Sequence, residues 1–124
     1  LLLGAEAMYR DKSGEIMFLN SYGSRLFVEL AIHWRVPIYV GMEWYKVIQW
    51  NSVPPLPKRE VELVRGPLGL DRQGWDLAVG HENIPLSEVL PASRVDGFLT
   101  PDGFVKSPEE VLEKAELWRQ RRPI

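Results

Sequence analysis

Residues 26–50 read LFVELAIHWRVPIYVGMEWYKVIQW, and Lys46 is the only even-numbered position in this run that is not apolar. An α-helix has no period of two, whereas side chains in a β-strand alternate between the two faces of a sheet. The run is also rich in Val, Ile, Trp and Tyr, which are common in strands. We therefore predict extended chain over residues 26–50, with one apolar face and one mixed face.

This extended segment must bend or fold back, because strands in proteins are usually about 3 to 10 residues long. Pro37 has no backbone N–H for a sheet hydrogen bond, and Gly41 tolerates unusual backbone torsions. We therefore predict a break between Arg35 and Gly41. Since the even positions stay apolar on both sides, the break should be a kink or a loop of odd length.

A helix over the first part of this run is the main structural alternative. Ser24 could cap such a helix, and its apolar face would consist of Leu26, Phe27, Leu30, Ala31 and Trp34. Followed by Pro37 and a second helix, it would form a helix-turn-helix. We prefer strands, because the helix would leave Val28 and Ile32 on its exposed side.

The rest of the chain is predicted to form short strands joined by turns. Turns rich in Gly, Asp, Asn and Ser are expected at 11–14 and 20–23, and a type I turn with a glycine bulge at 100–103. A proline-rich loop at 51–58 precedes strands at 59–65 and 75–79. A helix of one or two turns is expected over 86–90.

The C-terminal segment carries the strongest helix signals. Ser107 can act as N-cap, Pro108 suits the first helical position, and Glu110 completes a capping box. One apolar stripe is made of Val111, Leu112, Ala115 and Trp118. We predict a helix over 107–122 that packs on a sheet and ends before Pro123.

These patterns predict an α+β fold in one domain over residues 8–124. The expected architecture is a mostly antiparallel, strongly bent sheet or half-barrel of about five to seven strands, with one C-terminal helix packed on it. Residues 1–7 read LLLGAEA, which resembles the end of a signal peptide without its basic leader. We expect them to be cloning-derived or upstream residues of no structural importance.

The composition excludes several classes of function. A formal net charge of −2 argues against nucleic acid as a partner. The chain has no cysteine, which excludes disulfides, thiolate nucleophiles and cysteine zinc sites. No apolar run approaches the roughly 20 residues of a membrane helix, so no membrane association is expected. We expect a cytoplasmic location, with secretion as the alternative.

Candidate chemistry lies on the odd-numbered face of residues 26–50. If the sheet curls, Glu29, His33, Glu43 and Tyr45 would line a concave wall and serve as acid/base groups. Aromatic ligand-binding candidates are Trp34, Trp44 and Tyr39. The alternative is that this face is simply the solvated side of a half-buried sheet.

Metal ions and cofactors are not expected from the sequence. His33 and His81 do not have the spacing of a recognised metal-ligand motif, and nothing indicates a cofactor. The polar stretch at 80–83, which includes His81 and Glu82, is expected to form an ordinary turn.

The function predicted from these features is a small non-enzymatic binding or interaction module. It would self-associate as a homo-oligomer and could offer an aromatic-lined pocket to a small-molecule ligand. One alternative is a small pocket enzyme of the hydrolase or isomerase type, using the acid/base residues above. A second is a helix-turn-helix nucleic-acid binder.

Overall fold

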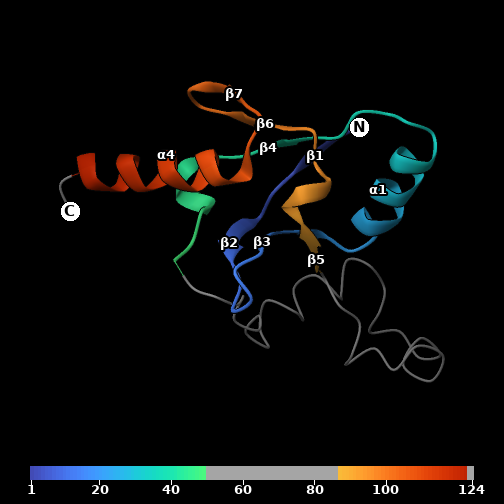
Figure 1. Cartoon of the computed structure of the whole chain (residues 1–124), viewed down its shortest axis with the longest axis horizontal. Helices are drawn as coiled ribbons and strands as arrows, with labels where there is room; N and C mark the ends of the chain where they lie inside the picture. Colours follow the sequence, from blue (N-terminus) through green and yellow to red (C-terminus); the bar gives the residue numbers. More distant parts are fainter. Residues whose placement is uncertain (50–86, 123–124) are drawn as a thin grey trace, which may run out of the picture. The chain divides into compact units, whose positions relative to one another are not determined.

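The structure is a computed structural model that describes residues 1–49 and 87–122 (Figure 1). The predicted loop at 51–58, the strands at 59–65 and 75–79, and the turn at 80–83 with His81 and Glu82 lie outside the described residues. Trp50, the last residue of the alternating run, also lies outside them.

The described residues form seven strands in two sheets. The four-stranded sheet has the order β1-β4-β6-β7 and consists of β1 (Leu2–Gly4), β4 (Tyr39–Gly41), β6 (Gly97–Thr100) and β7 (Gly103–Val105). The three-stranded sheet has the order β2-β3-β5 and consists of β2 (Ala7–Arg10), β3 (Ile16–Ser21) and β5 (Ser87–Pro91). The pairs β1–β4 and β4–β6 are parallel, and the other pairs are antiparallel.

Two α-helices accompany the sheets, α1 (Ser24–His33) and α4 (Pro108–Arg121). Short 3₁₀ turns follow β4 and β5, namely η1 (Trp44–Lys46) and η3 (Ala92–Arg94). The predicted α+β class and the C-terminal helix are thus confirmed. The strands are divided between two sheets, and the four-stranded sheet contains both parallel and antiparallel pairs.

The predicted extended chain over 26–50 is wrong in its first third, because residues 24–33 form α1. Ser24, Val28 and Ala31 are buried along one side of this helix. The exposed side is also apolar and includes Leu26, Phe27, Leu30 and Ile32. Apolar residues around the whole helix therefore produced the alternation that resembled a strand.

The predicted kink or odd loop after Arg35 is instead a helix-to-strand connection. Arg35 has φ 55°, in the left-handed region, and the Val36 N–H donates to Ala31 O at 2.8 Å, which ends the helix. Extended chain resumes only at β4, followed by η1. Because a strand and a single 3₁₀ turn follow α1, the helix-turn-helix alternative is also wrong, although its first helix exists.

Residues 1–7 are part of the fold, contrary to the expectation that they have no structural importance. Leu2–Gly4 form β1 and pair in parallel with β4, and Ala5 is 2% exposed. Leu1 and Leu3 pack against the core, whereas Leu2 between them is 64% exposed. The chain therefore enters the four-stranded sheet before Met8.

The predicted turns at 11–14 and 100–103 are present as hairpins. Asp11 Oδ1 accepts hydrogen bonds from the backbone N–H groups of Ser13 and Glu15, and Gly14 has φ 89°. At the second hairpin, Thr100 Oγ1 donates to Gly103 O at 2.7 Å and Gly103 has φ 110°. The short helix expected over 86–90 is wrong, since Ser87–Pro91 form β5 on the edge of β3.

The core joins both sheets, α1 and α4. Its largest fully buried side chains are Phe18, Phe98, Met8, Ile38, Val28, Val40 and Val111. Helix α4 begins as predicted, with the Glu110 N–H donating to Ser107 Oγ at 3.5 Å. It packs beside η1, where Arg119 Nη2 donates to Val47 O at 3.0 Å (Figure 1).

Candidate functional site

The carboxyl ends of β1, β4 and β6 meet at one edge of the four-stranded sheet. The parallel register aligns Gly4 with Gly41, and Gly41 with Leu99. The backbone pairing continues one residue further, because the Ala5 N–H donates to Gly41 O and the Met42 N–H donates to Leu99 O, at 3.2 and 3.0 Å. In sheets with parallel strands, ligands bind outside this edge.

Two carboxylates follow this edge at equivalent positions. Glu6 comes two residues after the end of β1, and Glu43 comes two residues after the end of β4. An open groove of about 380 Å³ lies at the ends of β4 and β6 and is lined by Gly41, Met42, Glu43, Lys46, Leu99, Thr100 and Pro101. We call it the edge groove.

At Glu6 the chain passes from one sheet to the other. The Ala5 N–H bonds to Gly41 O in the four-stranded sheet, and the next N–H, that of Glu6, donates to Leu19 O of β3 at 2.8 Å. The Glu6 backbone is thus fixed by a strand from each sheet.

The Glu6 carboxylate is held by two serine hydroxyls. Ser87 Oγ donates to Glu6 Oε2 at 2.7 Å, and Ser21 Oγ donates to Glu6 Oε1 at 3.4 Å. Ser21 and Ser87 lie directly opposite each other on β3 and β5. Glu6 itself is exposed, so its carboxylate is oriented yet open to a ligand. We call Glu6, Ser21 and Ser87 the Glu6 cluster.

A second set of hydrogen bonds fixes the turn from β3 into α1. Asn20 Nδ2 donates to Ser24 Oγ at 2.9 Å, and Ser24 Oγ donates to Ser21 O at 2.7 Å. Ser24 is buried, and Gly23 takes φ 100°, which favours glycine. These contacts hold the backbone of Ser21, and with it one side of the Glu6 cluster.

The first turn of α1 is capped by a side chain from β5. Glu88 Oε2 accepts from the Arg25 N–H at 2.8 Å, while Arg25 Nη2 donates to Val89 O at 2.7 Å. No side chain at the N-cap position, Gly23, performs this role. The Glu88 carboxylate satisfies a free N–H and places negative charge at the positive end of the helix dipole.

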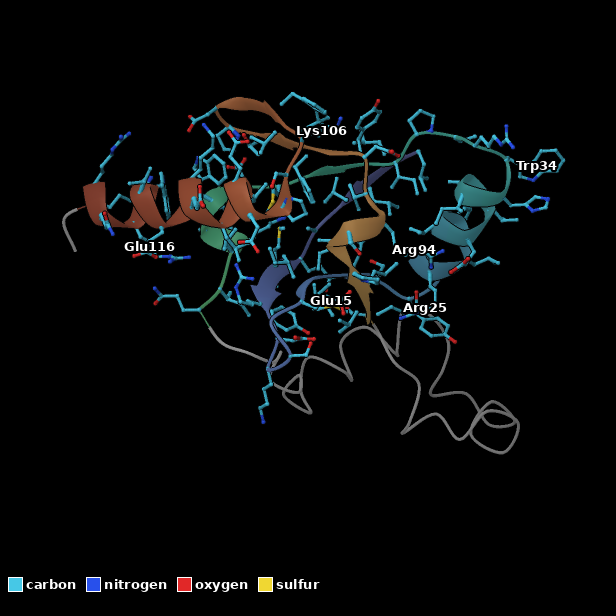
Figure 2. All side chains as sticks on the ribbon, viewed as in Figure 1. Glu15, Arg25, Trp34, Arg94, Lys106 and Glu116 are labelled. Carbon is cyan, nitrogen blue, oxygen red and sulfur yellow. The ribbon has the colours of Figure 1, made fainter. Side chains whose placement is uncertain are left out.

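Glu29, a predicted acid/base residue on α1, forms an ion pair with Arg94 of η3. Both of its carboxylate oxygens accept hydrogen bonds from the Arg94 guanidinium, and Figure 2 shows Arg94 beside α1. These bonds hold the pKa of the Glu29 carboxyl below its ordinary value. A carboxylate in such a pair is a weak proton acceptor at neutral pH.

The four predicted acid/base residues do not converge. Glu29 and His33 belong to α1, which leads into the amino end of β4, whereas Glu43 and Tyr45 follow its carboxyl end. Glu43 alone of the four lines the edge groove. The concave wall therefore does not form, because the segment expected to carry it as a strand is divided between a helix and a strand.

The three aromatic ligand candidates also lie apart. Trp34 is 72% exposed just after α1 and meets the His33 ring edge-on at 5.2 Å (Figure 2). Tyr39 contacts Phe104 edge-on at 6.0 Å, and Trp44 is 3% exposed in the core. The three do not share one pocket within the described residues.

Sequence reasoning missed the Glu6 cluster. Glu6 fell in the residues taken as upstream, Ser21 in a predicted turn and Ser87 in a predicted helix. The usable signal was local: an apolar run ending in Gly4, then an acidic residue, then a second strand. That order places a polar residue just after the carboxyl end of a short apolar strand, where the ligands of parallel sheets bind.

Within residues 1–49 and 87–122, no group of three or more His, Asp or Glu side chains could hold a metal ion. Over the same residues, no helix has both the length and the apolar character needed to cross a bilayer.

No protein-family model and no curated protein matches the sequence. Among solved structures, the chain is similar to the translation initiation factor eIF-2B subunit delta from A. fulgidus, with TM-score 0.59, 21% identity and coverage of 92% of this chain and 32% of that one. It is similar to 5-methylthioribose 1-phosphate isomerase from Pyrococcus horikoshii OT3, with TM-score 0.59, 21% identity and coverage of 94% and 32%. The tetrameric eIF2B-beta2-delta2 complex from C. thermophilum has TM-score 0.52, 18% identity and coverage of 98% and 30%.

These similarities show a shared fold, and the chain spans about a third of the length of the structures it matches. They also correct the function predicted from sequence. The proteins that share this fold are an isomerase and translation initiation factor subunits, which contradicts the predicted small non-enzymatic binding module.

Proposed function

We propose that this chain carries the proton-transfer group of an isomerase-type site for a phosphorylated sugar. The observation that carries the proposal is the Glu6 carboxylate, which is exposed and held between Ser21 and Ser87 at the carboxyl edge of parallel strands. The similarity in fold between this chain and 5-methylthioribose 1-phosphate isomerase supports a phosphorylated sugar as the substrate class.

An isomerase neither adds nor removes atoms from its substrate. A base that takes a proton from one carbon of a sugar can return it to the neighbouring atom, so one carboxylate can serve as acceptor and then as donor. Carboxylates perform this work when they are fixed within hydrogen-bond reach of the reacting proton. In the Glu6 cluster, two hydroxyls from paired strands provide that orientation.

The edge groove supplies a complementary charge for the phosphate. Lys46 is the cation among its lining residues, and Glu43 is the carboxylate. A lysine ammonium is a compact positive charge that suits a phosphate. In this proposal Lys46 binds the phosphate, and the polar groups at the edge of the sheet bind the sugar.

The test compares the purified wild-type chain with E6Q and with the control E15Q. Glu15 lies in the β2–β3 turn, where its backbone bonds to Asp11 (Figure 2). Binding of 5-methylthioribose 1-phosphate is measured by calorimetry, and isomerisation is followed by NMR. We expect E6Q to lower the isomerisation rate by at least about 100-fold, the usual contribution of an acid/base group. E15Q should behave as wild type.

Two outcomes would contradict this proposal. The wild-type chain would fail to bind the sugar phosphate, or E6Q would bind and isomerise it as well as wild type does. A loss of binding in K46Q with E6Q binding retained would support the division of roles between the two residues.

We propose in addition that the chain assembles as a homo-oligomer through the exposed side of α1. Large apolar side chains on α1 and on the residues directly after it are 42–72% exposed and comprise Leu26, Phe27, Leu30, Ile32, Trp34 and Val36. Clustered apolar surface of this kind marks interaction sites. A structure of the same fold is a tetrameric complex, which supports assembly as a property of this chain.

Light scattering after size-exclusion chromatography tests the assembly. F27E places a charge on this surface and should convert the oligomer to a monomer. L117E makes the same change at a half-exposed leucine on α4 and should leave the oligomer intact. A monomeric wild-type chain, or an oligomer unaffected by F27E, would contradict the proposal.

A further inference from the structure

A second hollow lies between α4, η1 and the β6–β7 turn. It has a volume of about 300 Å³, within the range of small-molecule sites, and we call it the Trp118 cleft. Its lining residues are Trp44, Pro101, Asp102, Lys114, Leu117, Trp118 and Arg121. Pro101 also lines the edge groove, so the two hollows are neighbours.

The wall formed by α4 follows from its sequence spacing. Lys114, Leu117, Trp118 and Arg121 stand at i, i+3, i+4 and i+7, which places them on one side of a helix. This side combines two apolar residues with a cation at each end. The neighbouring positions Val111 and Ala115 are fully buried and anchor the helix.

The two other walls are held in place by hydrogen bonds and packing. Trp44 is buried, and the Arg119 guanidinium ties α4 to Val47, directly after η1. The β6–β7 turn that bears Asp102 is closed by the bond from Thr100 Oγ1 to Gly103 O. The cleft therefore has walls whose positions are fixed by the fold.

The charges around the cleft favour an anion next to an aromatic ring. Lys114 has a loose ion pair with Glu110 at 3.9 Å, and Arg121 has no ion pair within the described residues. The Arg122 guanidinium lies 4.4 Å from the centre of the Trp118 ring and adds a third positive charge. Asp102 is the one carboxylate among the lining residues.

We propose that the Trp118 cleft binds an aromatic phosphate ester of the nucleoside monophosphate class. In this proposal the base displaces the Arg122 guanidinium from the Trp118 ring and stacks on the indole, as aromatic side chains do in nucleotide sites. Lys114 and Arg121 bind the phosphate, and Asp102 accepts hydrogen bonds from ribose hydroxyls. This site is separate from the Glu6 cluster, so it does not depend on the isomerase proposal.

Calorimetric titration of the full chain with AMP tests this proposal. The double variant K114Q/R121Q removes both phosphate-binding cations from an accessible helix surface and should weaken AMP binding at least tenfold. The control K106Q removes an exposed lysine near β7, outside the cleft, and should bind as wild type (Figure 2). Adenosine and inorganic phosphate should each bind more weakly than AMP.

Further variants separate this site from the edge groove. AMP binding that persists in E6Q and E43Q but is lost in K114Q/R121Q supports the Trp118 cleft. The proposal is overturned if K114Q/R121Q binds AMP as wild type does, or if E43Q alone abolishes binding. It is also overturned if inorganic phosphate binds as tightly as AMP, since the aromatic wall would then have no role.

Discussion

The carboxylate of Glu88 accepts a hydrogen bond from the backbone N–H of Arg25 at 2.8 Å, so a side chain of β5 caps a helix 63 positions earlier in the chain. The guanidinium of Arg25 completes the connection by donating to Val89 O. This pair of contacts holds the start of α1 against the sheet that carries Ser21 and Ser87.

Removing this cap should destabilise the fold. E88A leaves the Arg25 N–H without its partner and should lower the free energy of unfolding by about 1 kcal/mol, as the loss of an N-cap does. Urea unfolding followed by circular dichroism measures the difference. E113A, on the exposed side of α4, serves as the comparison and should change stability by less than about 0.5 kcal/mol. Equal effects of the two variants would contradict the capping role.

We expect a glycine to be needed at position 23 because of the backbone torsion there, and not because a side chain would clash with its surroundings. A Cβ at this position meets no atom within 4 Å, but φ is 100°. G23A should therefore destabilise the chain by about 1–2 kcal/mol, because residues with a side chain disfavour this region. G4A is the matched control: a Cβ at Gly4 also meets no atom within 4 Å, and its φ lies outside the left-handed range. Thermal unfolding of both variants isolates the cost of the backbone conformation, and equal melting temperatures of G23A and G4A would contradict it.

The first strand should contribute measurably to stability. Leu3 is partly buried against the core, whereas the adjacent Leu2 is 64% exposed. L3A should lower the free energy of unfolding by about 2 kcal/mol, and L2A by less than about 0.5 kcal/mol. If chemical denaturation shows the same stability for both variants, β1 does not pack as described.

Stability should fall on acidification through Glu29 and Glu109. Hydrogen bonds from Arg94 and Arg10 hold the pKa of each folded carboxyl below the ordinary value of 4.5. A lowered folded pKa means that the stabilisation is complete above about pH 4.5 and is lost as the pH falls through the folded value. E29Q/E109Q should therefore show a smaller drop in urea midpoint between pH 6 and pH 3 than wild type. An unchanged drop would show that neither ion pair contributes.

Local signals predicted the parts of the fold whose structure is decided locally. The cap at Ser107 with Pro108 specified the start of α4, and the Asp11 and Gly103 turns specified two hairpins. These elements depend on hydrogen bonds between residues a few positions apart, so the sequence alone contains the necessary information.

The elements that failed depend on distant partners. Residues 26–32 carry apolar side chains on both sides of α1, so the hydrophobic pattern could not distinguish a helix with an apolar exposed face from a strand. The Glu6 cluster unites residues from β3, β5 and the end of β1, and its geometry exists only after the two sheets meet. Parallel pairing of β1 with β4 spans 37 positions and leaves no local turn signal.

The crossing at Ala5 and Glu6 has a mechanical consequence. Two successive N–H groups bond to different sheets, the first to Gly41 O and the second to Leu19 O. Because the two donors belong to successive residues, one of these hydrogen bonds would have to break if one sheet slid against the other. The carboxylate of Glu6 therefore lies at the point where the chain joins the two sheets. A displacement of one sheet relative to the other would change the hydrogen bonds between Glu6 and the Ser21 and Ser87 hydroxyls.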